Sequence, residues 1–192
     1  MERGTRPDVP MDEAMNQAMD NGNLTTMQHI LLAFLKKCEG FRTMAYDDTE
    51  GLPTVGYGRL LSDGGPGWQG RNYDTKEDFN DVFPDGITEE EAEDALAEDV
   101  GVGITDAKKI AGPSTWVSLS PLRQAILANL AFNLGYGRLS KFRGFLRALN
   151  ALDYPLGAVE LLDSTRARQV RRRAALEAVA WITDDVDDLE LG

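Results

Sequence analysis

The sequence predicts a predominantly helical α+β fold, in which a small lobe carries a short antiparallel sheet and a helix joins it to a larger, all-helical lobe. Between residues 41 and 61, aromatic and β-branched residues alternate with Asp, Gly and Pro at short intervals, a pattern typical of short strands joined by tight turns. Apolar residues recur at helical spacing on both sides of this stretch. Thr88 and Glu91 form a capping box, which predicts the start of the joining helix.

The first helix is expected to begin after Thr25 or Thr26 and to end at Gly40, which places Glu39 in its last turn. Its apolar positions recur at helical spacing: Met27, Ile30, Leu31, Phe34 and Leu35.

The stretch from 63 to 86 is rich in Gly, Asp and Pro and is therefore expected to be a surface loop. Three aromatic residues in it are candidates to anchor the loop: Trp68, Tyr73 and Phe79. Gly101 and Gly103 are expected to weaken the far end of the joining helix.

Three regions follow from this pattern. Residues 1–23 form a polar N-terminal extension, residues 24–181 form one folded unit, and residues 182–192 form an acidic tail with little to bury. Within the folded unit, the small α+β lobe covers about 24–100 and the helical lobe about 101–181. The centre of the helical lobe is expected in the helix opened by Ser120 and Pro121, which is apolar nearly all round, with shorter helices at 140–149, 156–162 and about 169–181.

Composition excludes several classes of function. The chain has 32 acidic and 20 basic residues, and a net charge of -12 has the wrong sign for attraction to nucleic acid or to anionic membranes. The single cysteine, Cys38, has no partner for an internal disulfide, and the single histidine, His29, leaves no His/Cys metal cluster. No metal and no cofactor are therefore expected. The first 23 residues contain no apolar run long enough for a signal peptide or membrane helix, so no stable membrane insertion is expected.

The residues from Glu39 to Thr54 combine a glutamate at a helix end, an acidic turn at 47–51 and a threonine entering a strand. Hydrolysis of a glycosidic bond needs a protonated acid for the leaving oxygen and an ionised carboxylate that positions water on the opposite face. Apolar neighbours such as Leu35 and Phe41 favour the protonated form of Glu39, whereas an Asp in a polar turn stays ionised. By residue types alone, a structural role for these acids remains the commoner explanation.

The longer segment CEGFRTMAYDDTEGLPTVGYGRLL closely resembles the catalytic segment of the phage-type lysozymes, glycoside hydrolase family 24, the class of the T-even phage endolysins. The family motif is Glu-Gly after the first helix, then Tyr-x-Asp-x-x-Gly, Thr-x-Gly-x-Gly and a leucine pair, and this sequence meets it without a gap. The resemblance continues through GITEEEAEDALAEDV and NLAFNLGYGRLSKF to RQVRRRAALE, so it covers residues from about 28 to 181.

The resemblance implies a lysozyme-like catalytic domain over 24–181 that cleaves the β-1,4 bond between N-acetylmuramic acid and N-acetylglucosamine in peptidoglycan. Glu39 matches the general acid, Asp48 the carboxylate that orients water, and Thr54 the hydroxyl that holds the same water. The implied reaction is a single displacement with inversion at the anomeric carbon, performed by a monomer. Asp47 remains the competing carboxylate, and Thr54 can be explained as a strand former alone.

The resemblance also implies roles for other positions, each of which has an alternative explanation. Arg173 matches the arginine that pairs with the acid, but its neighbours Arg171 and Arg172 leave the choice open. Leu60 and Phe132 match positions that line the substrate cleft, although apolar residues there are as often plain core. Trp68 and Tyr73 either stack on sugar rings or, more commonly, pin their own loop.

Three positions depart from the family pattern. Arg59 stands where the best-known members have a histidine, which puts the ion pair of that residue in doubt. Phe145 and Glu160 replace small or polar residues associated with substrate contact, which predicts a different cleft shape.

The family context predicts a bacteriolytic phage endolysin or a virion-associated lysin. Such a protein is made in the host bacterial cytoplasm without a signal peptide and acts on the wall, in the periplasm, after holin release or virion delivery. Two rivals remain: a lytic transglycosylase, in which a sugar oxygen replaces water, and a non-catalytic wall-binding or virion structural protein. The complete set of Glu39, Asp48 and Thr54 favours the hydrolase.

Overall fold

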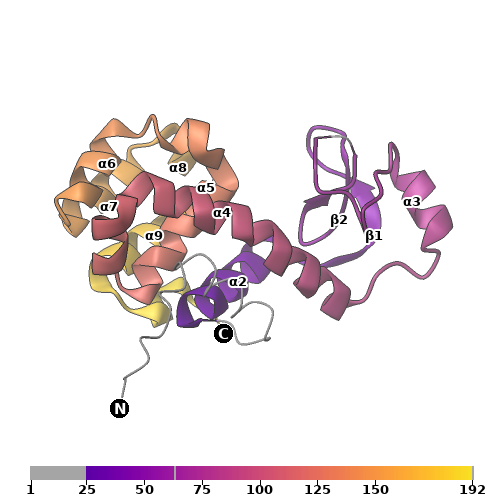
Figure 1. The fold of residues 1–192 in the computed structure, drawn as a ribbon, viewed down its shortest axis with the longest axis horizontal. Coiled ribbons are helices and arrows are strands. Elements are labelled where there is room, and N and C mark those ends of the chain that lie inside the picture. The colour runs from indigo at the N-terminus through magenta and orange to yellow at the C-terminus, as the bar shows by residue number, and fades with distance from the viewer. Residues whose placement is uncertain (1–24, 63, 192) are drawn as a thin grey trace, which may run out of the picture.

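The computed structural model describes residues 25–62 and 64–191, which form two lobes bridged by one long helix (Figure 1). The predicted α+β, lysozyme-like class is confirmed, because the described residues combine many helices with a single three-stranded sheet. The expectation of an N-terminal extension at 1–23 lies outside the described residues. The elements, in chain order, are α2 Thr26–Glu39, β1 Arg42–Asp47, β2 Pro53–Gly56, β3 Arg59–Leu60, α3 Lys76–Val82, α4 Glu89–Ser118, α5 Pro121–Leu139, α6 Arg143–Asn150, α7 Tyr154–Leu162, α8 Thr165–Gln169, α9 Arg171–Thr183 and the 3-10 helix η1 Val186–Leu189.

Helix α2 begins and ends as its sequence predicts. The Thr25 side chain accepts a hydrogen bond from the backbone N–H of Gln28 at 3.3 Å, and the Gln28 side chain accepts one from the Thr25 N–H at 2.9 Å. Gly40 ends the helix with φ +71, a conformation that costs glycine no steric penalty. Because Phe34 and Leu35 are buried in the core, the orientation of α2 is fixed and Glu39 is fixed with it.

The sheet has the order β1-β2-β3, with both pairings antiparallel, so the predicted hairpins are confirmed. Tyr46 on β1 faces Thr54 on β2, and Thr54 faces Leu60 on β3. Thr54 therefore occupies the central strand, flanked by residues from both neighbours.

The stretch after β3 is not entirely a loop. Residues 76–82 form α3, whose N-terminus is capped by the Thr75 side chain accepting from the Asp78 N–H at 3.1 Å. The sequence pattern missed this helix because it has seven residues and buries only Phe79, too few for a periodic signal.

The three aromatic residues of this stretch anchor it, as predicted. Trp68 and Tyr73 are 4% exposed and Phe79 is fully buried. The rings of Trp68 and Tyr73 meet that of Phe79 edge to face, with centroids 6.0 Å and 5.0 Å away. Buried rings of this kind are not available to stack on sugars, so the loop-pinning alternative is the correct one.

Helix α4 passes from the β lobe into the helical lobe (Figure 1). The predicted capping box is present, with the Glu91 carboxylate accepting from the Thr88 N–H at 2.8 Å. The expected weakening at Gly101 and Gly103 does not occur, because the helix runs on to Gly112, where φ +73 introduces a kink. Gly103 instead allows a close crossing, since a Cβ there would lie 2.9 Å from the Cβ of Phe132 on α5.

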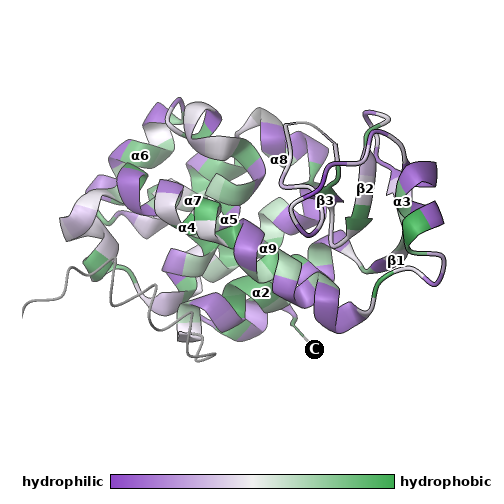
Figure 2. Ribbon diagram, turned by 45° about the vertical axis from the view of Figure 1, so that its right-hand side comes forward, coloured by the Kyte–Doolittle hydropathy of each residue, from purple (hydrophilic) through white to green (hydrophobic). Residues whose placement is uncertain are grey.

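Helix α5 is the centre of the helical lobe, as expected from its apolar sequence (Figure 2). Ser120 caps it, and its side chains Leu127 and Leu130 are fully buried. The acidic tail, expected to bury little, packs through Leu189 of η1, which is 1% exposed, and Glu190 lies 3.6 Å from the Lys37 ammonium of α2.

The two glycines of α4 give a matched test of the helix crossing. Gly103→Ala is expected to destabilise the fold by about 1–3 kcal/mol, because the added methyl overpacks the α4–α5 contact. Gly101→Ala is the control, since a Cβ there meets nothing within 4 Å. It should stabilise the helix by about 0.5–1 kcal/mol through its higher helix propensity. Urea unfolding measures both, and equal effects of the two changes would contradict the close crossing.

Candidate functional site

Glu39 at the end of α2 is bound by an arginine from the other end of the chain. Its Oε1 accepts a hydrogen bond from Arg173 Nη1 on α9 at 2.7 Å, with the two side chains 29% and 12% exposed. Arg172 instead pairs with Glu190, and Arg171 is exposed, so the structure selects Arg173 among the three adjacent arginines. The surroundings of Glu39 are thus less apolar than the sequence indicated, because a guanidinium is part of them.

The backbone of the β2–β3 turn approaches the same carboxylate. A Cβ at Gly58 would lie 4.0 Å from Glu39 Oε2, and the φ of +91 at this position favours glycine. The turn that carries the second half of the family motif therefore lies against the acid.

Asp48 is held in a hydrogen-bonded turn between β1 and β2. Its Oδ1 accepts from the backbone N–H groups of Glu50 at 2.8 Å and Leu52 at 2.9 Å, an arrangement that fixes the carboxylate. Asp47, the competing residue, forms an ion pair with Lys76 of α3. The two neighbouring aspartates thus have different partners, and Asp47 is engaged within the β lobe.

Tyr46 connects the positions of the predicted catalytic residues. Burial is the main cause that raises the pKa of its hydroxyl, Arg42 opposes the shift, and the carboxylates of Glu39 and Asp48 add to it. The charges of both carboxylates thus act on the Tyr46 hydroxyl, and Tyr46 is also the strand partner of Thr54. In the hairpin, Thr54 pairs with Tyr46, two residues before Asp48, and the Gly58 turn of the same sheet lies against Glu39.

Thr54 has a structural contact of its own. It is 4% exposed, and its Oγ1 donates to the Leu52 carbonyl at 3.1 Å. A hydroxyl that donates once still has lone pairs to accept from a water molecule. Both interpretations of Thr54, strand former and water holder, are compatible with this position.

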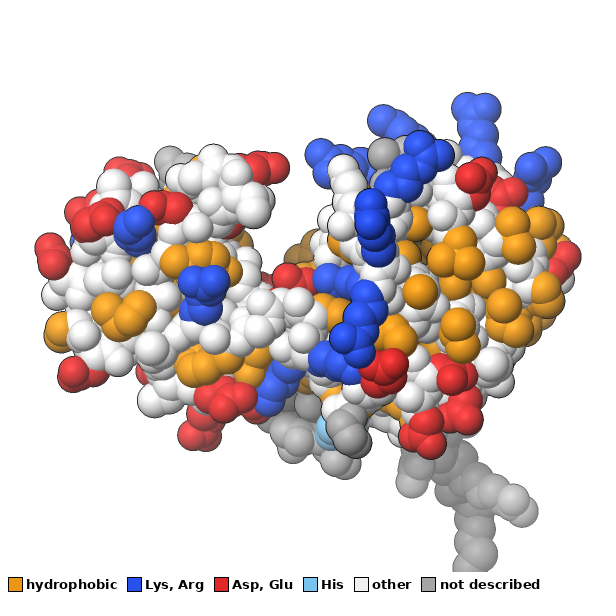
Figure 3. Space-filling view, turned by 180° about the vertical axis from the view of Figure 1, so that it is seen from behind, with side chains coloured by type: hydrophobic (Ala, Val, Ile, Leu, Met, Phe, Trp, Pro, Cys, Tyr) orange, Lys and Arg blue, Asp and Glu red, His pale blue; other side chains and the backbone are white. Residues whose placement is uncertain are grey.

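A cleft lies between the lobes, hollowed in the space-filling view (Figure 3). A cavity of about 520 Å³ in this region is lined by residues from β3, α4 and α5, among them the half-buried Leu60 and Phe132. Glycines at positions 58, 103 and 135 also line it. The structure therefore places both residues predicted to contact substrate in one cavity.

Arg59 anchors the β-lobe side of this cavity. Its Nη1 lies 3.0 Å from Asp99 and 3.1 Å from Glu98, both on α4, and its Nε donates to the Gly67 carbonyl at 2.6 Å. The doubt about an ion pair at this position is resolved, because arginine forms one. Asp99, which lines the cavity, was missed by the sequence analysis, since only the fold shows that it meets Arg59.

The two other departures lie near each other. Phe145 is 1% exposed and packs against Trp181 with ring centroids 5.4 Å apart, and it lines a cavity together with Glu160. This second cavity, of about 330 Å³, is also lined by other residues of α6. His29 is an exposed residue of α2, and Cys38 is partly buried and packs against the core.

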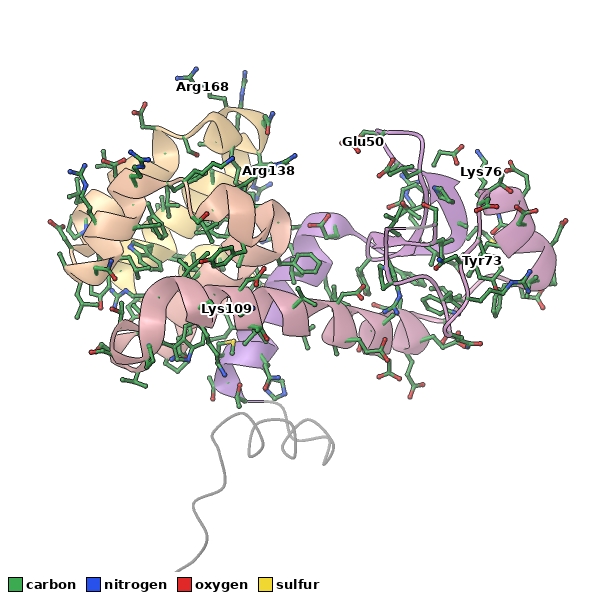
Figure 4. All side chains as sticks on the ribbon, turned by 45° about the horizontal axis from the view of Figure 1, so that its top comes forward. Glu50, Tyr73, Lys76, Lys109, Arg138 and Arg168 are labelled. Carbon is green, nitrogen blue, oxygen red and sulfur yellow. The ribbon has the colours of Figure 1, made fainter. Side chains whose placement is uncertain are left out.

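The helical lobe has a basic face at the edge of the cleft. Residues 138–173 contain nine Lys/Arg but three Asp/Glu, in a chain of net charge -12. Blue side chains gather along this edge in Figure 3, and in Figure 4 Arg138 extends toward the opposite rim, where Glu50 is placed. Several exposed basic side chains of residues 138–173 form no salt bridge within the described part of the chain: Arg138, Lys141, Arg143, Arg147, Arg168 and Arg171.

Among residues 25–62 and 64–191, no group of three His, Cys, Asp or Glu side chains is arranged to hold a metal ion. Within the same residues, every helix is too short or too polar to span a bilayer.

Comparisons with known proteins agree with this fold. The phage lysozyme family matches residues 36–177, so the chain belongs to the phage lysozyme family. It is 29% identical to the pre-baseplate central spike protein Gp5 of Enterobacteria phage T4, in an alignment that covers 94% of this chain and 31% of the spike protein. It is 28% identical to the probable T4-type lysozyme 2 of Dictyostelium discoideum, over 73% of this chain and 86% of that protein. The chain thus spans about a third of the spike protein's length.

Asp99 makes the stability of the fold depend on pH. Burial raises the pKa of its carboxyl from 3.8 to about 6, against the lowering effect of Arg59. Since the folded pKa exceeds the unfolded one, Asp99 contributes stability below about pH 4 that is lost as the pH rises through about 6. The change is at most about 3 kcal/mol, because one pKa unit corresponds to about 1.4 kcal/mol.

The difference in Tm between wild type and Asp99→Asn should therefore fall between pH 4 and pH 6 and level off above about pH 7. Glu98→Gln is the control, because Glu98 contacts the same arginine but its side chain is 73% exposed. A wild-type to Asp99→Asn difference that stays constant over this range would contradict the assignment.

Proposed function

We propose that this chain is a peptidoglycan N-acetylmuramidase that hydrolyses the β-1,4 bond between N-acetylmuramic acid and N-acetylglucosamine. The observation that carries the proposal is that the hairpin bearing Asp48 and Thr54 lies against Glu39 through the Gly58 turn, next to a cleft, in a chain of the phage lysozyme family. Two carboxylates beside a groove of this kind are what glycosidic hydrolysis requires.

Glu39 is the general acid of the proposed reaction. In its protonated form it donates its proton to the glycosidic oxygen as the bond to the anomeric carbon breaks. Arg173 restricts the carboxyl group to one orientation through the 2.7 Å contact, and the Gly58 turn lets the sugar chain approach without a side chain in the way.

Asp48 and Thr54 provide the nucleophile. Asp48, fixed by two backbone N–H groups, accepts a proton from a water molecule that the Thr54 hydroxyl also binds. The water attacks the anomeric carbon from the face opposite the leaving oxygen, so the product has inverted configuration. The basic face of the helical lobe supports binding of a wall that carries anionic groups, because exposed guanidinium groups attract carboxylates and phosphates.

Glu39→Gln tests the acid directly. Clearance of purified peptidoglycan should fall by at least about 100-fold, because loss of a general acid removes about 10²–10⁴ in rate. Mass analysis of fragments made in ¹⁸O-water separates the mechanisms. Reducing muramic ends that contain the label indicate hydrolysis, whereas unlabelled anhydro-muramic ends indicate a lytic transglycosylase. A folded wild type that clears nothing would favour a non-catalytic wall-binding protein.

Asp48→Asn and Asp47→Asn form a matched pair for the second carboxylate. Asp48→Asn should lower the rate by about 100-fold or more, since the amide does not accept the proton of the water. Asp47→Asn should keep nearly full activity, because Asp47 pairs with Lys76 on the β lobe. Initial clearance rates compare the two, and the reverse ranking would transfer the role to Asp47.

The two relatives point to different biological roles for the proposed activity. The match to the T4 spike protein covers 94% of the chain, which favours a virion-associated lysin that opens the wall during entry. The match to a lysozyme of comparable length favours a separate enzyme, such as an endolysin released at lysis. Mass spectrometry of purified virions distinguishes them, because the chain would be present in the particle in the first case and absent in the second.

A further inference from the structure

Behind the pair of Glu39 and Arg173 lies a second, buried ion pair. Glu177 on α9 is fully buried, and its two oxygens accept from the guanidinium of Arg166 on α8 at 2.6 Å and 2.7 Å. Arg166 is itself 8% exposed. A buried charge pair of this kind stabilises a fold little compared with an apolar pair of similar volume, so its presence calls for another explanation.

Hydrogen bonds connect the Arg166–Glu177 pair to Glu39. Asn129 on α5, also fully buried, donates from Nδ2 to Glu177 Oε1 at 2.7 Å. The Oδ1 of the same amide accepts from Arg173 Nη2 at 2.6 Å. Arg173 then donates from Nη1 to Glu39. A continuous chain of polar contacts thus runs from Arg166 to the carboxylate of the acid.

Glu177 also acts on Arg173 directly. Its Oε1 lies 3.4 Å from Arg173 Nε, a buried nitrogen with no hydrogen-bond partner in the described residues. The contact is therefore electrostatic, and the orientation of Arg173 depends on the charge of Glu177 and on the amide of Asn129. Arg166 donates to both oxygens of Glu177 and so balances its charge inside the lobe.

We infer that Glu177, held by Arg166, is a positioning residue for catalysis: it fixes Arg173, which in turn fixes the proton-donating carboxyl of Glu39. The inference rests on the proposed muramidase activity and adds two residues that do not touch the substrate. Its physical basis is that an acid must be placed to within a fraction of an ångström, and that a displacement of about 1 Å can cost about 100-fold in rate.

Glu177→Gln tests the inference, because it keeps the size of the side chain and removes the charge. The expected result is a loss of about 10-fold in kcat on solubilised peptidoglycan strands, with KM unchanged, since the substrate cleft is not altered. The assay is run well below the Tm of the variant, so that a loss of stability alone does not lower kcat. Unchanged kcat in the folded variant would overturn the inference.

A double-mutant cycle with Arg173→Gln shows whether Glu177 acts through Arg173. If it does, Glu177→Gln should change kcat by less than about twofold once Arg173 is replaced, because coupled residues are not additive. The same loss in both backgrounds would overturn the proposed route.

A second variant covers the case in which Glu177→Gln does not fold. Arg166→Met combined with Glu177→Leu replaces the pair by apolar side chains, a change that folded proteins often tolerate. It should show the same fall in kcat, and full activity would overturn the inference. Arg123→Gln is the control, because Arg123, whose side chain is 12% exposed, forms an ion pair with the partly exposed Asp184 away from the cleft. It should lower the Tm and leave kcat unchanged.

The activity of the wild type distinguishes failure of the inference from failure of the proposed function. An active wild type with an unaffected Glu177→Gln variant refutes the positioning role alone. A folded wild type without activity refutes the proposed function and the inference with it.

Discussion

The ion pair between Glu39 and Arg173 is the interaction on which the arrangement of the site depends. It joins the C-terminal end of α2 to the first turn of α9, across 134 residues of chain. A carboxylate at the C-terminal end of a helix is opposed by the partial negative charge of the helix dipole, so it requires a nearby cation. Lys36 and Lys37 lie in the same turn but pair with other acids, which leaves this task to Arg173.

A second set of contacts determines where the β lobe stands relative to α4. Arg59 reaches two acidic side chains of α4 and a backbone carbonyl of the following loop, so one side chain connects three segments. At the other end of the cleft, the absence of a side chain at Gly103 lets α4 and α5 approach closely. Together these contacts bring β3, α4 and α5 around one cavity.

The polar chain from Arg166 to Glu39 shows how the proposed general acid is supported from within a hydrophobic lobe. Asn129 and Glu177 are fully buried, yet each has partners for its polar atoms. Satisfied buried networks are rigid, because each member loses hydrogen bonds if another moves. Because the network is rigid, we expect substitutions at Glu177 or Arg166 to change the position of the Glu39 carboxyl group.

The sequence by itself determined the local features. The capped start of α2, the tight antiparallel turns of 41–61 and the capping box of α4 all follow from residues within a few positions of each other. The motif that contains Glu39, Asp48 and Thr54 was equally visible, because its members lie within sixteen consecutive residues.

Only the tertiary structure decided the long-range partners. Glu39 pairs with Arg173 and not with the two adjacent arginines, and Arg59 pairs with Asp99. Phe145 is buried in the core, and Arg166 pairs with Glu177. The residue types alone do not show whether two such side chains are in contact. The physical reason is that an ion pair or a core contact depends on distance and burial, which packing of the helices sets and which no spacing along the chain encodes.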